Sequence, residues 1–214
     1  MVRVERSAIS NGVRRNENMA EHYFSKSQTS ELKITEFKTH IRGFDITLKL
    51  GSGTFSAKKV DAGSRLLAET MRIHKHDAVL DLGCGTGIVG IIASKMTNNK
   101  VIMTDVNERA CMLAKENTKG IQNAEVRCGS MYEPVKSDKF DAIILNPPHT
   151  AGKDVCIKMI EQAFDFLNKG GSLQIVARHN KGGETLSEHM KEVFGNMQDI
   201  AKKGGYRVYM SVRE

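Results

Sequence analysis

The chain has 214 residues, of which 40% are hydrophobic and 27% are charged, as in an ordinary globular protein. This composition excludes a wholly disordered chain, and no apolar run approaches the roughly 18 residues that a membrane-spanning helix needs. The N-terminus lacks the apolar core of a secretory signal and the four cysteines are far apart, so we expect a reduced, cytoplasmic protein.

The net charge of +7 is concentrated in the N-terminal third of the chain. Residues 1–76 contain 14 basic and 8 acidic side chains, a net charge of +6, and residues 77–214 carry the remaining +1. A basic segment on a nearly neutral body favours a polyanionic partner, because neutralising phosphates releases counterions. A solvated face that serves solubility would give the same composition, so charge alone leaves both interpretations open.

The N-terminal third predicts an arm followed by strands and a helix. Residues 1–18 are polar and basic without periodicity, which predicts a mobile basic arm. We expect residues 19–76 to form an N-terminal extension. Its alternating and helical patterns predict strands at 32–34 and 44–50, a turn at 51–53, and a helix at 64–73.

From residue 78 onward, short apolar strands alternate with helical stretches. The strands are expected at 78–82, 101–105, 124–128, 140–145 and 172–177, and the helices at 87–97, 107–118, 153–168 and 183–194. This alternation is typical of βαβ units, and therefore predicts an α/β fold with a parallel sheet covered on both faces. The last two apolar segments, 197–202 and 206–212, flank a Lys-Gly-Gly junction and predict an antiparallel pair.

A glycine-rich turn between the strand at 78–82 and the next helix is the strongest motif. Gly83, Gly85 and Gly87 stand at alternate positions in it. Glycine is needed where the backbone takes a positive φ or approaches a ligand closely. Asp105 ends the next predicted strand, where a carboxylate can accept both hydroxyls of a ribose. The turn and this carboxylate predict a cofactor that contains a nucleoside.

Asp81 distinguishes between two such cofactors. The spacing Gly85-x-Gly87-x-x-Gly90 formally matches a dinucleotide-binding turn. A carboxylate two residues before the first glycine would repel a pyrophosphate, but it would attract the ammonium and sulfonium groups of S-adenosyl-L-methionine. We therefore favour this methyl donor, with S-adenosyl-L-homocysteine as its product.

A second motif, Asn146-Pro147-Pro148-His149, follows the predicted strand at 140–145. The prolines fix φ and stiffen the loop at the carboxyl end of a strand, where open α/β sheets bind ligands. The side-chain carbonyl of Asn146 and the backbone carbonyl of Pro147 can accept both hydrogens of an exocyclic amine. That arrangement aims the nitrogen lone pair at a methyl group without a general base. The ring of His149 offers a surface on which a base could stack.

The two motifs together point to a family. Residues 81–87 and 146–149 resemble the class I S-adenosylmethionine-dependent methyltransferases that act on amino nitrogens. Further strings resemble the "methyltransferase small" domain of the ribosomal RNA guanine-N2 methyltransferases and of single-domain archaeal relatives. These strings lie at 22–25, 53–56, 60–67, 152–153 and 203–208. The likeness covers roughly residues 20–212.

The resemblance implies a Rossmann-like, seven-stranded, mostly parallel sheet with an antiparallel C-terminal hairpin strand, and a methyltransferase domain over residues 77–214. The catalytic residues that it implies are Asn146, Pro147, Pro148 and His149. The cofactor-binding residues are Asp81, Gly83, Cys84, Gly85, Thr86, Gly87, Asp105, Val106, Ser130, Met131 and Asn146. The substrate-binding residues are Phe55, Lys153 and Arg207.

Three observations qualify this site. His149 stands where the family usually has Phe or Tyr, and Ser130 stands where an acid that contacts adenine is expected. His74 and His76 could suggest a metal pair, but no third ligand type clusters with them in the sequence, so we expect no metal.

The leading hypothesis is an RNA methyltransferase that acts on guanine N2 of ribosomal RNA, free or in a ribosomal particle. Transfer RNA guanine-N2 or adenine-N6 methylation and protein glutamine N5-methylation use the same amine chemistry and stay open as alternatives. His149 and the basic excess argue against glutamine as the acceptor. A non-catalytic, cofactor-binding assembly partner is a third class, and the intact Asn-Pro-Pro string argues against it. The sequence leaves the oligomeric state open.

Overall fold

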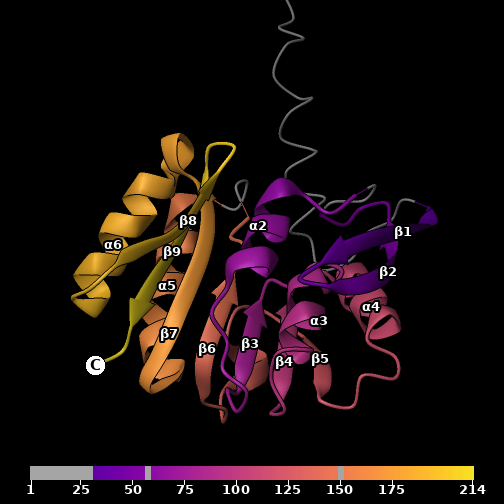
Figure 1. Ribbon diagram of the computed structural model, residues 1–214, viewed down its shortest axis with the longest axis horizontal. Coiled ribbons are helices and arrows are strands. Elements are labelled where there is room, and N and C mark those ends of the chain that lie inside the picture. Colours follow the sequence, from indigo (N-terminus) through magenta and orange to yellow (C-terminus); the bar gives the residue numbers. More distant parts are fainter. Residues whose placement is uncertain (1–30, 56–58, 149–151) are drawn as a thin grey trace, which may run out of the picture.

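The computed structural model describes residues 31–55, 59–148 and 152–214, and Figure 1 shows their arrangement. The expectation of a mobile arm at residues 1–18 lies outside the described residues. The same holds for the string at 22–25.

A seven-stranded sheet forms the centre of the molecule (Figure 1). Its strands are β3 (Val79–Leu82), β4 (Val101–Asp105), β5 (Ala124–Cys128), β6 (Phe140–Leu145), β7 (Leu167–Arg178), β8 (Gln198–Lys203) and β9 (Tyr206–Val212). The spatial order is β5-β4-β3-β6-β7-β9-β8, and β9 runs antiparallel to both of its neighbours. The predicted α/β fold with one antiparallel C-terminal strand is confirmed.

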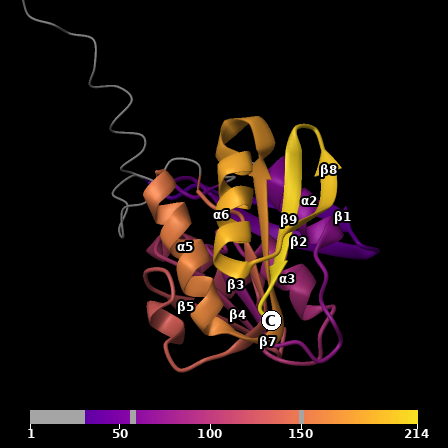
Figure 2. The same cartoon turned by 90° about the vertical axis from the view of Figure 1, so that its left-hand side faces the viewer.

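Helices cover both faces of this sheet. They are α2 (Ala62–Thr70), α3 (Ile88–Ser94), α4 (Glu108–Asn117), α5 (Lys153–Phe166) and α6 (Glu184–Phe194), with short turns η1 (Glu133–Val135) and η2 (His179–Gly183). One buried apolar cluster lies between the sheet and α2 and α3, and a second lies between the sheet and α5 and α6 (Figure 2). None of the helices in the described parts of the chain is long and apolar enough to cross a membrane.

A separate hairpin precedes the sheet. Strands β1 (Ile34–Ile41) and β2 (Phe44–Gly51) pair antiparallel, and Arg42 and Gly43 form the turn with positive φ angles of 52° and 81°. The predicted strand at 32–34 shares only Ile34 with β1, which lies further along the chain. Most side chains of β1 are exposed, so its hydrophobic alternation is weak, and pairing with the half-buried β2 defines it instead.

The other predicted elements agree to within a few residues, except at β7. This strand begins at Leu167, five residues before the predicted start, and α5 correspondingly ends at Phe166. Its pairing with β6 shifts register between Leu167 and Ser172, across two glycines. Glycines interrupt the apolar pattern, so only hydrogen bonding to the neighbouring strand reveals this part of β7.

Gln174 ties the link between α2 and β3 to the sheet. Its side chain is fully buried in β7. The N–H of Arg72 donates to Gln174 Oε1 at 2.8 Å, and Gln174 Nε2 donates to the Arg72 carbonyl oxygen at 2.7 Å. The amide thus satisfies one donor and one acceptor of an irregular segment that leads into the central strand.

We expect Gln174→Leu to lower the free energy of unfolding by about 1–3 kcal/mol, since it leaves the two backbone groups of Arg72 without these partners. Denaturant unfolding measures the change. The control is Gln198→Leu on the exposed part of β8, with an expected change within about 0.5 kcal/mol. Equal losses in both variants would contradict the role given to Gln174.

Candidate active site

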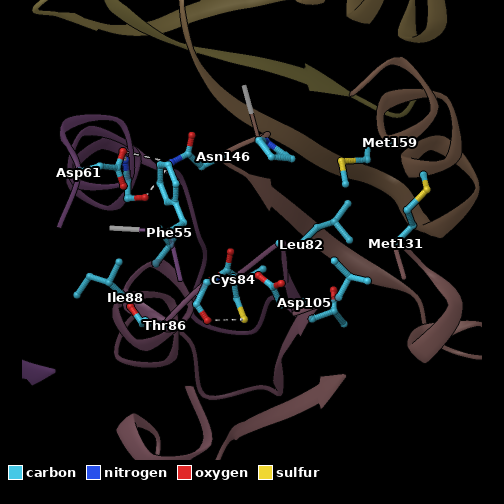
Figure 3. A pocket seen from close by; sticks show the side chains of 18 of the residues that line it. Phe55, Asp61, Leu82, Cys84, Thr86, Ile88, Asp105, Met131, Asn146 and Met159 are labelled. Atoms are coloured by element: carbon cyan, nitrogen blue, oxygen red, sulfur yellow. Dashed lines mark hydrogen bonds between the residues drawn. The ribbon is translucent and has the colours of Figure 1, made fainter. Parts of the chain in front are cut away.

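A cavity of about 530 Å³ opens at the carboxyl ends of β3, β4 and β6 (Figure 3). Strands β4 and β5 lie on one side of β3 in the strand order, and β6 lies on the other side. The strand order therefore reverses at β3. Ligands of open α/β sheets bind at such points, and the volume lies within the roughly 300–1,000 Å³ of small-molecule sites.

The register of the sheet brings the two sequence motifs together. Leu82 of β3 pairs in parallel with Leu145 of β6. The next residues, Gly83 and Asn146, therefore leave the sheet from adjacent strands at the same edge, where strands lie about 4.8 Å apart. The structure thus unites two motifs that are 63 residues apart in the chain, and both line the cavity.

The glycine turn presents open space to the cavity, and several of its N–H groups are bonded within the protein. Gly83 and Gly85 have φ angles of 73° and 56°, and a Cβ on either would meet no atom within 4 Å. The N–H groups of Gly83 and Cys84 donate to the Thr104 carbonyl at 2.8 and 2.9 Å, and that of Gly85 donates to Asp105 Oδ2 at 2.8 Å. Three N–H groups of the turn are therefore already bonded within the protein.

Asp105 lies at the cavity wall as the last residue of β4. It accepts the N–H of Gly85 at Oδ2 and that of Asn107 at Oδ1, at 2.8 and 2.9 Å. Burial raises the pKa of Asp105, and its backbone hydrogen bonds oppose that rise. Each carboxylate oxygen can accept more than one hydrogen bond, so the group can also accept a hydroxyl.

Asp81 connects the central strand to the helix behind the turn. Its side chain is 3% exposed, and its Oδ2 accepts the Gly90 N–H at 2.8 Å. Burial raises the pKa of Asp81 to about 7, with a contribution from the nearby Asp105 carboxyl, while the Gly90 hydrogen bond opposes the rise. Asp81 therefore has a structural contact that the sequence motif did not suggest, besides its place in the cavity lining.

The Asn146 side chain is held from one side. Its Nδ2 donates to Ser64 Oγ at 2.8 Å and to Asp61 Oδ1 at 3.3 Å, as the dashed lines of Figure 3 show for the labelled pair. Pro148 lines the cavity, whereas Pro147 is buried outside the lining. His149 lies outside the described residues, so its predicted stacking role stays a prediction.

The remaining predicted residues divide into two groups. The ones that line the cavity are Phe55, Cys84, Thr86, Val106, Ser130 and Met131. The others do not line it. Gly87 is the N-cap of α3, and Lys153 is exposed at the start of α5. Arg207 pairs with Asp199 of β8 at 3.0 Å.

Sequence reasoning missed part of the site. The lining also contains Leu50, Val60, Asp61, Ser64, Leu82, Ile88, Val89, Thr104, Gly129, Val155 and Met159. Asp61 is the N-cap of α2 and accepts the Ser64 N–H at 2.9 Å. An aspartate ahead of a helical pattern is a recognisable cap, so the sequence could have placed the helix start here, but not at the cavity.

The chemistry of the lining fits a cationic ligand with a nucleoside part. Among the described lining residues, the charged side chains are three aspartates, Asp61, Asp81 and Asp105, and none is Lys or Arg. The buried hydroxyl of Thr104 has no hydrogen-bond partner within the described parts of the chain. Those parts contain no group of three His, Cys, Asp or Glu side chains that could hold a metal.

The fold and this site define a class I, S-adenosylmethionine-dependent methyltransferase. The sequence profile of the methyltransferase small domain family matches residues 45–210. The chain belongs to this family, and the family and the cofactor indicated by the sequence are confirmed.

Two related proteins align with most of the chain. YbxB, an uncharacterized protein of Bacillus subtilis, is 34% identical over 195 residues, which are 89% of this chain and 97% of that protein. Ribosomal RNA small subunit methyltransferase C of Haemophilus influenzae is 34% identical over 197 residues, 88% of this chain but 58% of that enzyme. The chain therefore spans little more than half the length of this methyltransferase.

Solved structures share the fold. The 16S rRNA N2 G1207 methyltransferase of Thermus thermophilus, solved with AdoMet and guanosine, has a TM-score of 0.74 and 24% identity. The match covers 86% of this chain and 52% of that one. A methyltransferase of Pyrococcus furiosus has a TM-score of 0.60 and 27% identity, covering 70% of this chain and 81% of that one.

Asp81 gives a prediction about pH. An unfolded aspartate titrates near pH 3.9, so between about pH 4 and pH 7 the folded state retains a proton that the unfolded state has lost. The contribution of Asp81 to stability therefore falls as the pH rises through this window. Asn cannot ionise, and its Oδ1 can still accept the Gly90 N–H. As the pH rises through this window, we expect the unfolding free energy of Asp81→Asn to increase relative to wild type by up to about 1.4 kcal/mol per pH unit.

Unfolding free energies at several values between pH 4.5 and pH 8 test this expectation. The control is Glu188→Gln on the exposed face of α6, whose difference from wild type should change much less with pH. A constant difference between Asp81→Asn and wild type across the range would show that burial does not raise the pKa of this carboxyl.

Proposed function

We propose that this protein transfers the methyl group of S-adenosylmethionine to an exocyclic amine of RNA, with guanine N2 of ribosomal RNA as the preferred acceptor. The observation that carries the proposal is the position of Asn146 next to the glycine turn, in one cavity lined by acids. The names of the Haemophilus and Thermus relatives support the choice of acceptor. The concentration of basic residues before residue 77 is consistent with a polyanionic substrate.

On the cofactor side, bound S-adenosylmethionine supplies an electrophilic methyl group on a positively charged sulfur. Asp105 binds the ribose hydroxyls through its second acceptor sites. Val106, Met131 and Met159 give an apolar surface for the adenine ring, next to the Ser130 hydroxyl. The carboxylate of Asp81 favours the positive charge of the methionine part, and the open space at Gly83 and Gly85 admits that part without a side chain in the way.

On the acceptor side, the amide oxygen of Asn146 and the backbone carbonyl of Pro147 accept the two amine hydrogens. These bonds orient the nitrogen lone pair toward the methyl group and stabilise the positive charge that grows on nitrogen during transfer. Phe55 lines the same cavity and provides an aromatic face for the base, together with the predicted face of His149. Lys153, exposed at the start of α5, and Arg207 remain candidate contacts to the phosphate backbone.

Substitutions on the acceptor side should affect turnover, and substitutions on the cofactor side should affect cofactor binding. We expect Asn146→Ala to reduce turnover by roughly 100-fold to 1,000-fold, because it removes an oriented acceptor, while cofactor affinity changes little. Asp105→Asn removes a charge-assisted acceptor and should weaken cofactor binding by about tenfold. Calorimetry with S-adenosylmethionine and single-turnover methylation give the two readouts. Turnover of Asn146→Ala near the wild-type rate would refute the role of the amide.

The acceptor is identified with a labelled methyl donor. The protein is incubated separately with ribosomal RNA, intact ribosomal subunits, transfer RNA and total protein, and labelled RNA is digested to nucleosides. We expect label in N2-methylguanosine from ribosomal RNA or its particle. Label in transfer RNA, in N6-methyladenosine or in protein glutamine would replace the proposed acceptor. Absence of label in all four, with intact cofactor binding, would support the non-catalytic alternative.

A further inference from the structure

The side-chain amide of Asn146 has two chemically opposite ends. Only its oxygen can accept the hydrogens of a substrate amine, whereas its nitrogen would point two N–H groups at those hydrogens. A rotation of the amide by about 180° exchanges the two ends with almost no change in shape. A site that depends on this oxygen therefore needs contacts that choose the orientation.

The first turn of α2 supplies such contacts. Asp61 Oδ1 accepts the Asn146 Nδ2 hydrogen at 3.3 Å, and Ser64 Oγ accepts from the same nitrogen at 2.8 Å. An ionised aspartate can only accept hydrogen bonds, so it pairs with the nitrogen end and would repel the oxygen end. In Figure 3 the nitrogen of Asn146 is turned toward Asp61 and the oxygen lies on the other side of the amide.

Both partners are themselves fixed. Asp61 caps α2 by accepting the Ser64 N–H at 2.9 Å, with the same oxygen that faces Asn146. Ser64 is 7% exposed, so little water competes for its hydroxyl. The cap therefore places two acceptors at defined positions, and the Asn146 amide meets them from a segment more than 80 residues away.

A third element holds this turn against the cavity. A Cβ built on Gly63 would lie 3.1 Å from the Tyr206 ring, so the ring packs directly on the first turn of α2. The guanidinium of Arg178 lies over the Tyr206 ring, 5.1 Å from its centre. The start of β9 and the end of β7 thus pack beside the first turn of α2.

From this geometry we propose that Asp61 and Ser64 are positioning residues for methyl transfer. They hold the Nδ2 end of Asn146, so that Oδ1 faces the acceptor amine. The inference rests on the proposed function of Asn146. It also gives a role to residues 60–67, a string that resembles the family but had no function assigned from the sequence.

The kinetic test uses Ser64→Ala, Asp61→Ala and Asp61→Asn. We expect the two alanine variants to lower kcat by about 10-fold to 100-fold, because a misoriented amide loses its acceptor. In Ser64→Ala, cofactor affinity and the KM for RNA should stay within about threefold, since this change removes no charge from the cavity. Asp61→Asn keeps an acceptor oxygen and the cap, so it should recover part of the lost kcat.

Ser187→Ala is the matched control. Ser187 is also a buried serine in the first turn of a helix, its Oγ donates to the Glu184 carbonyl at 2.7 Å, and it does not line the cavity. We expect wild-type kcat from it. An equal loss of kcat in Ser187→Ala and Ser64→Ala would mean that general destabilisation, not positioning, explains the result.

A second readout needs no substrate. The two Nδ2 protons of Asn146 are identified in the NMR spectrum of the ¹⁵N-labelled full chain by their loss in Asn146→Ala. We expect them to exchange slowly with water in wild type and markedly faster in Ser64→Ala and Asp61→Ala. Unchanged exchange in both variants overturns the anchoring, and faster exchange with unchanged kcat overturns its catalytic role.

The two proposals fail in different ways. If wild type methylates none of the acceptors, the proposed function fails, and the NMR comparison still decides whether α2 anchors the amide. If wild type methylates RNA and both alanine variants match its kcat, the proposed function stands and the positioning role is wrong.

Discussion

The parallel pairing of β3 with β6 is the constraint on which the rest of the structure depends. Because Leu82 and Leu145 are in register, the glycine turn and Asn146 leave the sheet at neighbouring points of one edge. In this register, paired residues of the two strands enter the same apolar cluster, Val79 with Ala142 on one face and Leu80 with Ile143 on the other, so packing on both faces holds the register. The packing of the core therefore also determines where the two motifs of the site lie.

The second organising feature is the negative charge of the cavity. Asp81 and Asp105 are buried at the ends of adjacent strands, and each accepts backbone N–H groups of the turn or of the helix behind it. These hydrogen bonds offset part of the cost of burying a carboxyl. The same contacts thus shape the turn, and the acidic lining of the cavity favours a cationic cofactor.

Strand β2 and helix α2, which precede the sheet in the chain, pack into its core. Side chains of β2 and α2 belong to the same buried cluster as α3 and the central strands. The first turn of α2 forms the cavity wall opposite the glycine turn, and Tyr206 of the last strand packs against it. The first turn of α2 thus contacts both Tyr206 and Asn146, the residue proposed to orient the acceptor.

The sequence by itself determined the α/β class, most of the elements and the two motifs, because apolar periodicity, glycine spacing and an Asn-Pro-Pro string are local signals. It failed where the signal is not local. The long β1 and the early start of β7 depend on pairing with other strands, since exposed side chains and glycines carry little pattern. Asp61 and Ser64 read as an ordinary helix cap, and only the packing of α2 against α3, β7 and β9 brings them to Asn146. Arg207 and Lys153 lie outside the cavity for the same reason, because the direction of a side chain is set by tertiary packing.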